Sequence, residues 1–570
     1  MDRSIQPMDY EAAAAAGGPP SPGHFRRRKQ GGWITFPFIQ ATMAGLTLAA
    51  GGVVNNLIVY LIQEFSMKSI SAAKVYNAVN GCITIFPILG AIIADSFLGC
   101  FSVIWISSLI SLLATVLIVL TASIDSLRPA ECDGSSGCIK PTTVQYAVLY
   151  AGLALMCIGV AGTRFTIATM GADQFDTPKQ RQVSINWYVF TLYTSSVIAT
   201  TAIVFVEDNV SWAWGFGICV AFNVVGLAVF LSGKRFYRRV MAQGSPFIGL
   251  ARVLVAALRK RGEPVLSEGA VYYHDPQVEA IKMASPTPTE FLKVLNYAAL
   301  ITEGDAKLDG SIAKPWRLCT VEQVEDLKSL FKLFPLWASG LCLSTPLVIQ
   351  ASLAVLQALK MDRQMGPHIK IPSGSVVVFI LISTSITITF IDRVLYPLMA
   401  KYTTRSLTPL QRIGVGHALI LLSMAISALV EARRLKVADS NNLQVQSNGG
   451  VVPMSVFWLV PPLALAGVGE AFTFPGNVAF YYQEFPESLK STSTAVVAMF
   501  IGICYYLGNA VMDLLQRVTG WLPDNINDGR VDNVFWACSV LVAANFGYYM
   551  VCACMYKYKD TDGKQNEGNE

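Results

Sequence analysis

Charged side chains are scarce in this sequence. Asp, Glu, Lys and Arg make up 14% of its 570 residues, whereas 53% of the residues are hydrophobic. A soluble globular domain carries about 25% charged residues. The shortage argues against a soluble protein and indicates a polytopic membrane protein whose core is the helix bundle itself. Basic residues interleaved with aromatic ones are also lacking, so no nucleic-acid partner is expected.

Residues that commonly build metal and catalytic sites are few or scattered. The four histidines, at positions 24, 274, 368 and 417, form no cluster, and no Cys/His spacing suits a metal ion. We find no pair of catalytic carboxylates and no Ser/His arrangement, so we expect neither an enzyme nor a cofactor. Cys132 and Cys138 share the polar loop 123–143. A disulfide and two free thiols are both open for them, depending on the side of the membrane that the loop faces.

Long apolar segments fill most of the chain. A helix rises about 1.5 Å per residue, so about 20 apolar residues cross the hydrocarbon core of a bilayer. On this basis we predict about twelve spans, close to Ile34–Gln63, Ala73–Ala94, Phe101–Ala122, Val144–Met170, Val183–Val206, Ala213–Ser232, Leu330–Leu356, Ser373–Leu398, Leu410–Val430, Ser455–Phe480, Thr492–Leu515 and Val534–Met555.

The spans divide the chain into two halves. We predict an N-terminal tail (1–32), a six-helix half (33–232), a linker (233–327), a second six-helix half (328–556) and a C-terminal tail (557–570). The basic run Arg26–Lys29 precedes the first span and places the tails and the linker in the cytoplasm. In the linker, Ser245–Arg261 has apolar residues at helical spacing and a basic end. It predicts an amphipathic helix on the inner membrane surface, with an ordinary solvated helix as the alternative.

A weak internal echo supports the two halves. The second span of each half ends at an aspartate, Asp95 in the first half and Asp392 in the second. Parallel halves with a substrate site between them are the plan of the major facilitator superfamily. We therefore predict an all-α membrane protein of that fold, which works by rocking one half against the other. Asp95 and Asp392 are expected to cap or latch helices at the cytoplasmic ends of their spans.

Two ionisable residues lie deep inside predicted spans. They are Arg164 in the fourth span and Glu470 in the tenth. Charges at membrane depth are costly, and they commonly face the bundle interior, an aqueous path or a partner of opposite sign. Arg164 is either an anion site, one member of an ion pair with Glu470, or a side chain that reaches the cytoplasmic interface. A pair between the two residues would be either a gate, in which a substrate anion competes with Glu470, or purely structural.

Several longer motifs resemble the plant nitrate/peptide transporter family. They are GAIIADSFLG (90–99), GADQFD (171–176), Asn186-Trp187-Tyr188, GSPF (244–247), WRLCTVEQVEDLK (316–328), DRVLYPL (392–398), LTPLQRIG (407–414) and FYYQEFPESLKS (480–491). The resemblance runs from Trp33 to about Lys559. It implies a major-facilitator fold and, usually, proton-coupled uptake of nitrate, peptides or other organic solutes.

The departures from the family pattern carry the functional prediction. The family's first span typically holds two glutamates and a basic residue tied to proton coupling, and these places hold Met43, Leu46 and Thr47 here. The family lysine of the fourth span is Arg164, and the tenth-span glutamate is retained as Glu470. An arginine stays charged, whereas a buried lysine can lose its proton. The combination is similar to the subgroup associated with nitrate excretion and low-affinity nitrate or chloride movement.

We therefore expect a plasma-membrane or internal-membrane transporter that moves nitrate as a low-affinity facilitator or exporter, with chloride as a further candidate substrate. Arg164 would attract the anion, Glu470 would compete for Arg164, and Gln350 and Ser344 of the seventh span would donate hydrogen bonds to it. One alternative is a proton-coupled importer of nitrate, peptide or another organic solute that uses Glu470. A further alternative is a membrane sensor that binds a ligand without transporting it.

Overall fold

The computed structural model of the chain describes residues 30–129, 141–238, 246–261, 272–274, 288–302, 304–305, 307, 312–367, 369–402, 407–443, 450–486, 493–556 and 558. Arg26–Lys29, Cys132 and Cys138 lie outside the described residues, so the predictions that rest on them stay predictions.

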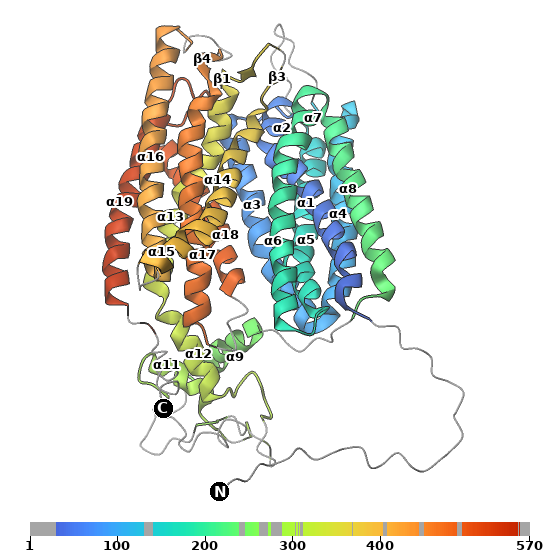
Figure 1. Ribbon diagram of the computed structural model, residues 1–570, viewed down its shortest axis with the longest axis vertical. Helices are drawn as coiled ribbons and strands as arrows, with labels where there is room; N and C mark the ends of the chain where they lie inside the picture. Colours follow the sequence, from blue (N-terminus) through green and yellow to red (C-terminus); the bar gives the residue numbers. More distant parts are fainter. Residues whose placement is uncertain are drawn as a thin grey trace, which may run out of the picture.

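The N-terminal half is a bundle of long helices (Figure 1). Its elements are η1 (Gly32–Ile34), α1 (Phe36–Asn55), α2 (Leu57–Gln63), α3 (Ser69–Ile93), the π-helical turn η2 (Ala94–Leu98), α4 (Gly99–Ser123), η3 (Asp125–Leu127), α5 (Thr143–Asp173), α6 (Pro178–Ile198), the π-helical turn η4 (Ala199–Ile203), α7 (Val204–Asn209) and α8 (Trp212–Ser232).

The linker contains shorter helices. They are η5 (Gly233–Arg235), α9 (Pro246–Arg259), α11 (Lys293–Asn296), η6 (Tyr297–Ala299) and α12 (Val321–Phe331).

The C-terminal half is a second bundle of helices. Four short strands lie in the loops at one of its ends. Its elements are α13 (Phe334–Leu359), β1 (Met361–Asp362), β2 (Gln364–Met365), β3 (Ile369–Lys370), η7 (Ser373–Val377), α14 (Val378–Phe390), the π-helical turn η8 (Ile391–Leu395), α15 (Tyr396–Tyr402), α16 (Pro409–Ser440), β4 (Val452–Ser455), η9 (Val456–Leu459), α17 (Val460–Glu484), α18 (Ser493–Val518) and α19 (Val531–Met555). Strand β1 pairs in parallel with β4, and β2 pairs with β3 in an antiparallel hairpin.

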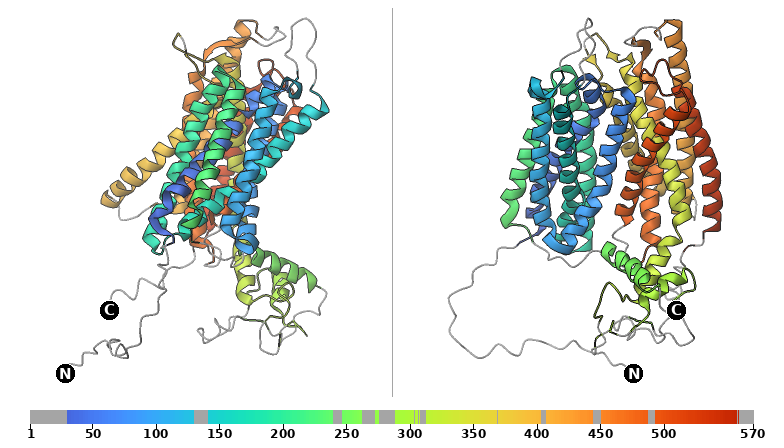
Figure 2. Two further views of the ribbon diagram at one scale, coloured as in Figure 1. Left: turned by 90° about the vertical axis from the view of Figure 1, so that its right-hand side faces the viewer. Right: turned by 180° about the vertical axis from the view of Figure 1, so that it is seen from behind.

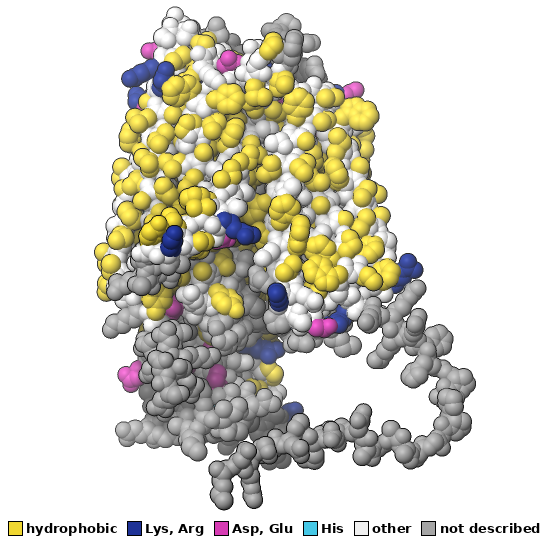
Figure 3. Space-filling model, in the orientation of Figure 1, with side chains coloured by type: hydrophobic (Ala, Val, Ile, Leu, Met, Phe, Trp, Pro, Cys, Tyr) yellow, Lys and Arg dark blue, Asp and Glu magenta, His cyan; other side chains and the backbone are white. Residues whose placement is uncertain are grey.

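Eleven helical stretches among the described residues are long and apolar enough to cross a membrane. One of them, Ser69–Ser123, has 55 residues and contains both α3 and α4, so it accounts for two of the twelve predicted spans. The two helices meet at Gly99, whose φ of +74° is readily adopted by glycine. Figure 3 shows hydrophobic side chains over most of the bundle surface and charged ones mainly toward its two ends. The chain is a predominantly helical, multi-pass membrane protein.

The echo between the two halves has a structural counterpart. Asp95 and Asp392 each occupy the second position of a five-residue π-helical turn, η2 after α3 and η8 after α14. π-helical turns are rare and are often found at functional sites. The same turn at the end of the second span in both halves therefore supports an internal repeat.

Local sequence explains where several helices begin. Thr142, Thr320 and Thr408 each accept a hydrogen bond from the backbone N–H three residues on, and the glutamine at that position reaches back to the threonine's own N–H. These reciprocal capping boxes satisfy backbone donors that would otherwise be left unpaired at the starts of α5, α12 and α16.

The linker differs from the expectation of a helix whose apolar face rests on the membrane. Val253, Ala256 and Ala257 of α9 are buried in a small core that α9 shares with α11, η6 and α12. Lys260, at the end of α9, forms a buried ion pair with Asp305, with 2.8 Å between Nζ and Oδ2. Leu254 and Leu258 are exposed. The apolar stripe of α9 with Val253, Ala256 and Ala257 thus packs within the linker itself. Only the stripe with Leu254 and Leu258 is free to contact the membrane surface.

Candidate functional site

The two halves meet at the end of the bundle opposite the linker. Arg363, which follows β1, donates to Asp208 at the end of α7 with an N–O distance of 3.0 Å, and both side chains are over 90% buried. Close by, the Ser375 hydroxyl of η7 donates to the Thr200 carbonyl of η4 at 2.6 Å. An apolar core containing residues of both halves, among them Val79, Ile349 and Met512, extends the contact.

Further contacts across the halves join α3 to α18. Lys74 forms an ion pair with Asp513, and Asn77 donates to Asn509 at 3.0 Å. Toward the linker the helices of the two halves spread apart in the front and rear views (Figures 1 and 2). The arrangement is that of a two-half bundle closed at one end. The sequence analysis did not predict these pairs, because charged residues at span ends give no indication of which charge meets which.

Arg164 is presented by the linker-side part of α5. Gly162, two residues earlier, allows close packing against α4, since a Cβ atom there would lie 1.8 Å from Ser107 Oγ. Two residues are about 200° apart around a helix, so Arg164 lies on the face away from that contact. The phenol of Tyr188 on α6 donates to the Arg164 carbonyl at 2.5 Å and fixes this part of α5 to α6. The Arg164 side chain is half-buried.

Glu470 lies on α17 in the other half and is also half-buried. Its neighbours Gly467 and Gly469 pack closely on α14 and α16, because Cβ atoms there would lie 2.1 Å from Ser383 Oγ and 2.6 Å from Ile420 Cγ1. The charges of both Arg164 and Glu470 act on the hydroxyls of Tyr193 and Tyr505. Because Tyr193 belongs to α6 and Tyr505 to α18, the two charges share surroundings between the halves.

The predicted pair is not formed in this conformation. Within the described residues, no ion pair shorter than 4.0 Å joins Arg164 to Glu470, and neither side chain has a hydrogen bond. Arg164 and Glu470 therefore lie in the same region between the halves without forming an ion pair. Whether they gate one another in another conformation stays a prediction.

The seventh-span residues divide into two cases. Gln350 is 1% exposed, and its amide donates to Ser423 and Ser427 of α16 at 2.9 and 2.8 Å. Both N–H groups are thus used inside the C-terminal half in this conformation, and a role for Gln350 in binding an anion stays a prediction. Ser344 is half-buried on α13 and interacts with the Cys504 thiol of α18.

The two aspartates differ in their environments. Asp95 is half-buried and interacts electrostatically with Asp173 at the end of α5. Asp392 is exposed and has no ion pair or hydrogen bond within the described part of the chain. A latch at either aspartate is thus not formed here.

The first-span positions that lack the expected charges pack instead. Met43 and Leu46 are 3% and 6% exposed in a core with Ile104 and Ile167. Their side chains fill space inside the N-terminal half, and the site between the halves holds Arg164 and Glu470 as its deep charges.

Two helical halves in contact at one end, with opposite charges in the region between them, are the plan of a membrane transporter. Solved structures of transporters have the same fold. The chain is similar to the POT family transporter PepTSo (TM-score 0.65, 19% identity, 92% of this chain and 99% of that one) and to an auto-inhibited POT family peptide transporter (TM-score 0.63, 19% identity, 93% and 98%). At this identity the likeness establishes the fold.

Sequence comparison establishes the family. The POT family profile matches residues 101–527. Two Arabidopsis thaliana relatives are Protein NRT1/PTR FAMILY 2.7, 50% identical over 95% of this chain and 96% of its own length, and NRT1/PTR FAMILY 2.6, 49% identical over 95% of each. NRT1/PTR FAMILY 3.1 of the same plant is 36% identical over 93% and 92%. The chain belongs to the POT family, on its plant NRT1/PTR branch, and is a transporter.

Proposed function

We propose that this transporter moves nitrate, and also chloride, as a low-affinity facilitator or exporter in the plasma membrane. The observation that carries the proposal is Arg164, a half-buried and permanently charged side chain between the halves with no anionic partner in the described residues. An uncompensated charge at membrane depth is costly, and a small anion would remove that cost.

The planar guanidinium also suits a planar oxyanion, because its N–H groups form a fork that can donate two parallel hydrogen bonds. The tyrosine hydroxyls of Tyr193 and Tyr505 lie within the influence of the same charge and could complete the donor set. We infer that the contacts at the end opposite the linker close the outer side, because the linker is predicted to be cytoplasmic, and that nitrate reaches Arg164 from the cell interior.

The test is nitrate flux by Arg164 variants in liposomes. Arg164→Ala should abolish flux without loss of folded protein, because the positive charge is gone. Arg164→Lys should keep part of the flux and make it pH-dependent, since a lysine in a poorly solvated site can lose its proton. Arg393→Ala, which removes an exposed cation at the linker end of the C-terminal half, is the matched control and should transport normally. Full flux in Arg164→Ala would show that the anion binds elsewhere.

The separation of Arg164 and Glu470 also favours a second function, proton-coupled import. Because Arg164 and Glu470 are unpaired, the region could also receive a solute that carries both a carboxylate and an ammonium group, or Glu470 could carry a proton. The protein would then be a proton-coupled importer of nitrate, peptide or another organic solute. Glu470→Gln separates the functions: a nitrate facilitator should retain downhill flux, whereas a proton-coupled importer should lose uphill uptake.

A further inference from the structure

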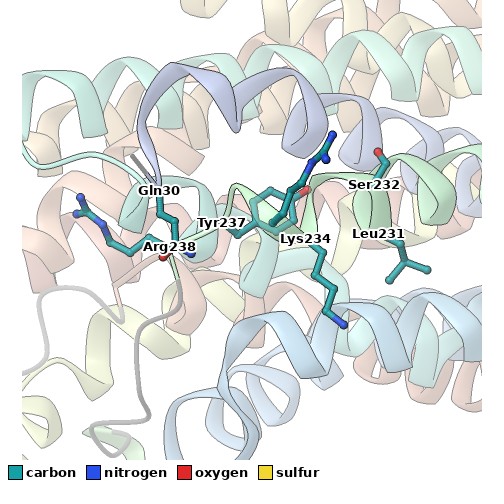
Figure 4. A pocket seen from close by; sticks show the side chains of 7 residues that line it. Gln30, Leu231, Ser232, Lys234, Tyr237 and Arg238 are labelled. Atoms are coloured by element: carbon teal, nitrogen blue, oxygen red, sulfur yellow. The ribbon is translucent and has the colours of Figure 1, made fainter. Parts of the chain in front are cut away.

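A basic pocket lies at the linker end of the N-terminal half, away from Arg164 and Glu470. It has a volume of about 670 Å³ and is lined by Gln30, Leu231, Ser232, Lys234, Arg235, Tyr237 and Arg238. Figure 4 shows Arg238 and Gln30 on one side of it, Tyr237 in the middle, and Lys234, Ser232 and Leu231 on the other side. Its volume is in the range of pockets that hold small organic groups.

The pocket has a positive charge that the described residues do not neutralise. Arg238 is bound to Asp176, with Nη1 and Oδ1 2.5 Å apart, and this contact holds the pKa of the Asp176 carboxyl below its ordinary value. Lys234 and Arg235 are exposed and have no ion pair within the described residues; the Arg235 guanidinium lies over the Phe236 ring, 4.9 Å from its centroid. Two full positive charges are thus available to an anionic ligand.

A buried polar group adds a second observation. Tyr237 is 1% exposed, and its hydroxyl has no hydrogen-bond partner. Its ring packs against Phe101 and Phe230, so the side chain is held in place. Buried hydroxyls normally have a partner. Tyr237 lines the same pocket as Lys234 and Arg235, so its unpartnered hydroxyl points to a ligand that brings hydrogen-bond acceptors.

The position of the pocket relative to the bilayer indicates that the anionic ligand is a lipid headgroup. The apolar span that contains α8 ends at Arg235, so Lys234 and Arg235 lie at the level of lipid headgroups. On α8, the exposed Val224 and Leu231 are seven residues apart and therefore lie on one face of the helix, which leads to the pocket at Leu231. Trp33, three residues after Gln30, is also exposed, as is common for tryptophan at a membrane interface. The exposed apolar face of α8 could therefore contact the acyl chains of a lipid whose headgroup lies in the adjoining basic pocket.

We propose that this pocket binds the phosphate-bearing headgroup of an anionic phospholipid in the leaflet on the linker side. The phosphate lies against Lys234 and Arg235, the Tyr237 hydroxyl supplies a further donor, and an acyl chain follows Leu231 and Val224 along α8. Lysine provides a point charge and arginine a planar fork for the phosphate oxygens. Basic pockets on the cytoplasmic side of transmembrane helices bind anionic headgroups in this manner. The site is independent of the transported substrate.

The experiment measures retained lipid by native mass spectrometry of the full-length protein, purified in detergent and supplied with phosphatidic acid, phosphatidylcholine or inorganic phosphate. The test variant is Lys234→Ala/Arg235→Ala. The matched control is Arg393→Ala/Lys401→Ala, which removes two exposed cations at the linker end of the other half. Near an anionic lipid surface the loss of two cations corresponds to an affinity drop of roughly 30-fold. Lys234→Arg/Arg235→Lys keeps both charges and should retain binding.

We expect the wild type and the control to retain phosphatidic acid in preference to phosphatidylcholine, and the test variant to lose that preference while eluting as a monodisperse protein. Equal loss in the test and control variants would overturn the proposal in favour of diffuse charge attraction. Inorganic phosphate that displaces the lipid with similar affinity would also overturn it, because the pocket would then serve a soluble anion.

Discussion

The buried ion pair at the seam should hold the two halves closed at the end opposite the linker. The Asp208 and Arg363 side chains are only 7% and 9% exposed, and Arg363 has one further acceptor, the Ile371 carbonyl at 3.2 Å. Asp208→Asn removes the charge that neutralises Arg363 in the closed state, whereas water solvates Arg363 once the seam opens. Loss of one partner from a desolvated charge pair costs about 2 kcal/mol or more, so the closed-to-open ratio should fall about 30-fold.

The shift can be measured with spin labels at Val210→Cys and Met365→Cys, two exposed positions on either side of the seam, after the native cysteines that a label could reach are changed to serine, among them Cys132, Cys138, Cys342 and Cys554. Double electron–electron resonance should give one short distance in the parent protein and an added longer distance in Asp208→Asn.

The exposed pair Lys68–Asp524, 2.5 Å long and at the same end, provides the matched control. Exposed pairs contribute about 0–1 kcal/mol, so Asp524→Asn should shift the ratio by less than about fivefold. Identical distance distributions in Asp208→Asn and Asp524→Asn would refute the reasoning that the buried pair holds the seam.

Two further predictions concern stability. Arg434→Met leaves the fully buried Glu431 without its cation and should cost about 3–5 kcal/mol, seen as a lower melting temperature in detergent. Arg434→Met/Glu431→Met should recover part of the loss, because no uncompensated charge remains although Gln357 and Asn527 lose a partner each; a double variant as unstable as the single one would contradict this. In the linker, burial alone would raise the pKa of Asp305, but hydrogen bonds from Lys260 and Thr302 outweigh it and hold the pKa below its ordinary value. The resulting stabilisation is full above about pH 4 and is lost as the pH falls through the lowered pKa. The protection factors of the α9 amides against hydrogen exchange should therefore fall on acidification in the wild type and much less in Asp305→Asn.

Sequence reasoning was strongest where composition and periodicity dominate. Apolar runs located the spans, and the Asp95/Asp392 echo coincides with two matching π-helical turns. It failed where buried polar groups satisfy one another. The predicted span Leu410–Val430 stops before Glu431, but α16 continues to Ser440 because Glu431 and Arg434 pair with each other and bond to Gln357 and Asn527.

In the candidate site, too, some features can be predicted from the sequence and others depend on tertiary contacts. Arg164 and Glu470 could be singled out because charges at membrane depth are rare, and the structure brings both to the region between the halves. Their separation depends on the conformation, which a sequence does not specify. The serine partners of Gln350 are 73 and 77 residues away along the chain, a tertiary contact that has no local signal in the sequence.

We propose that nitrate moves through this protein along its own electrochemical gradient. At the places where family members carry titratable first-span groups, Met43, Leu46 and Thr47 cannot titrate, and two of these side chains are buried in the core. The most direct measurement is nitrate flux in liposomes, with membrane potential and pH gradient set independently and proton movement recorded at the same time. We predict flux that follows the nitrate gradient and the potential and depends weakly on pH. An inward proton current that appears only with nitrate and reverses with the pH gradient would contradict the claim and assign the coupling to Glu470.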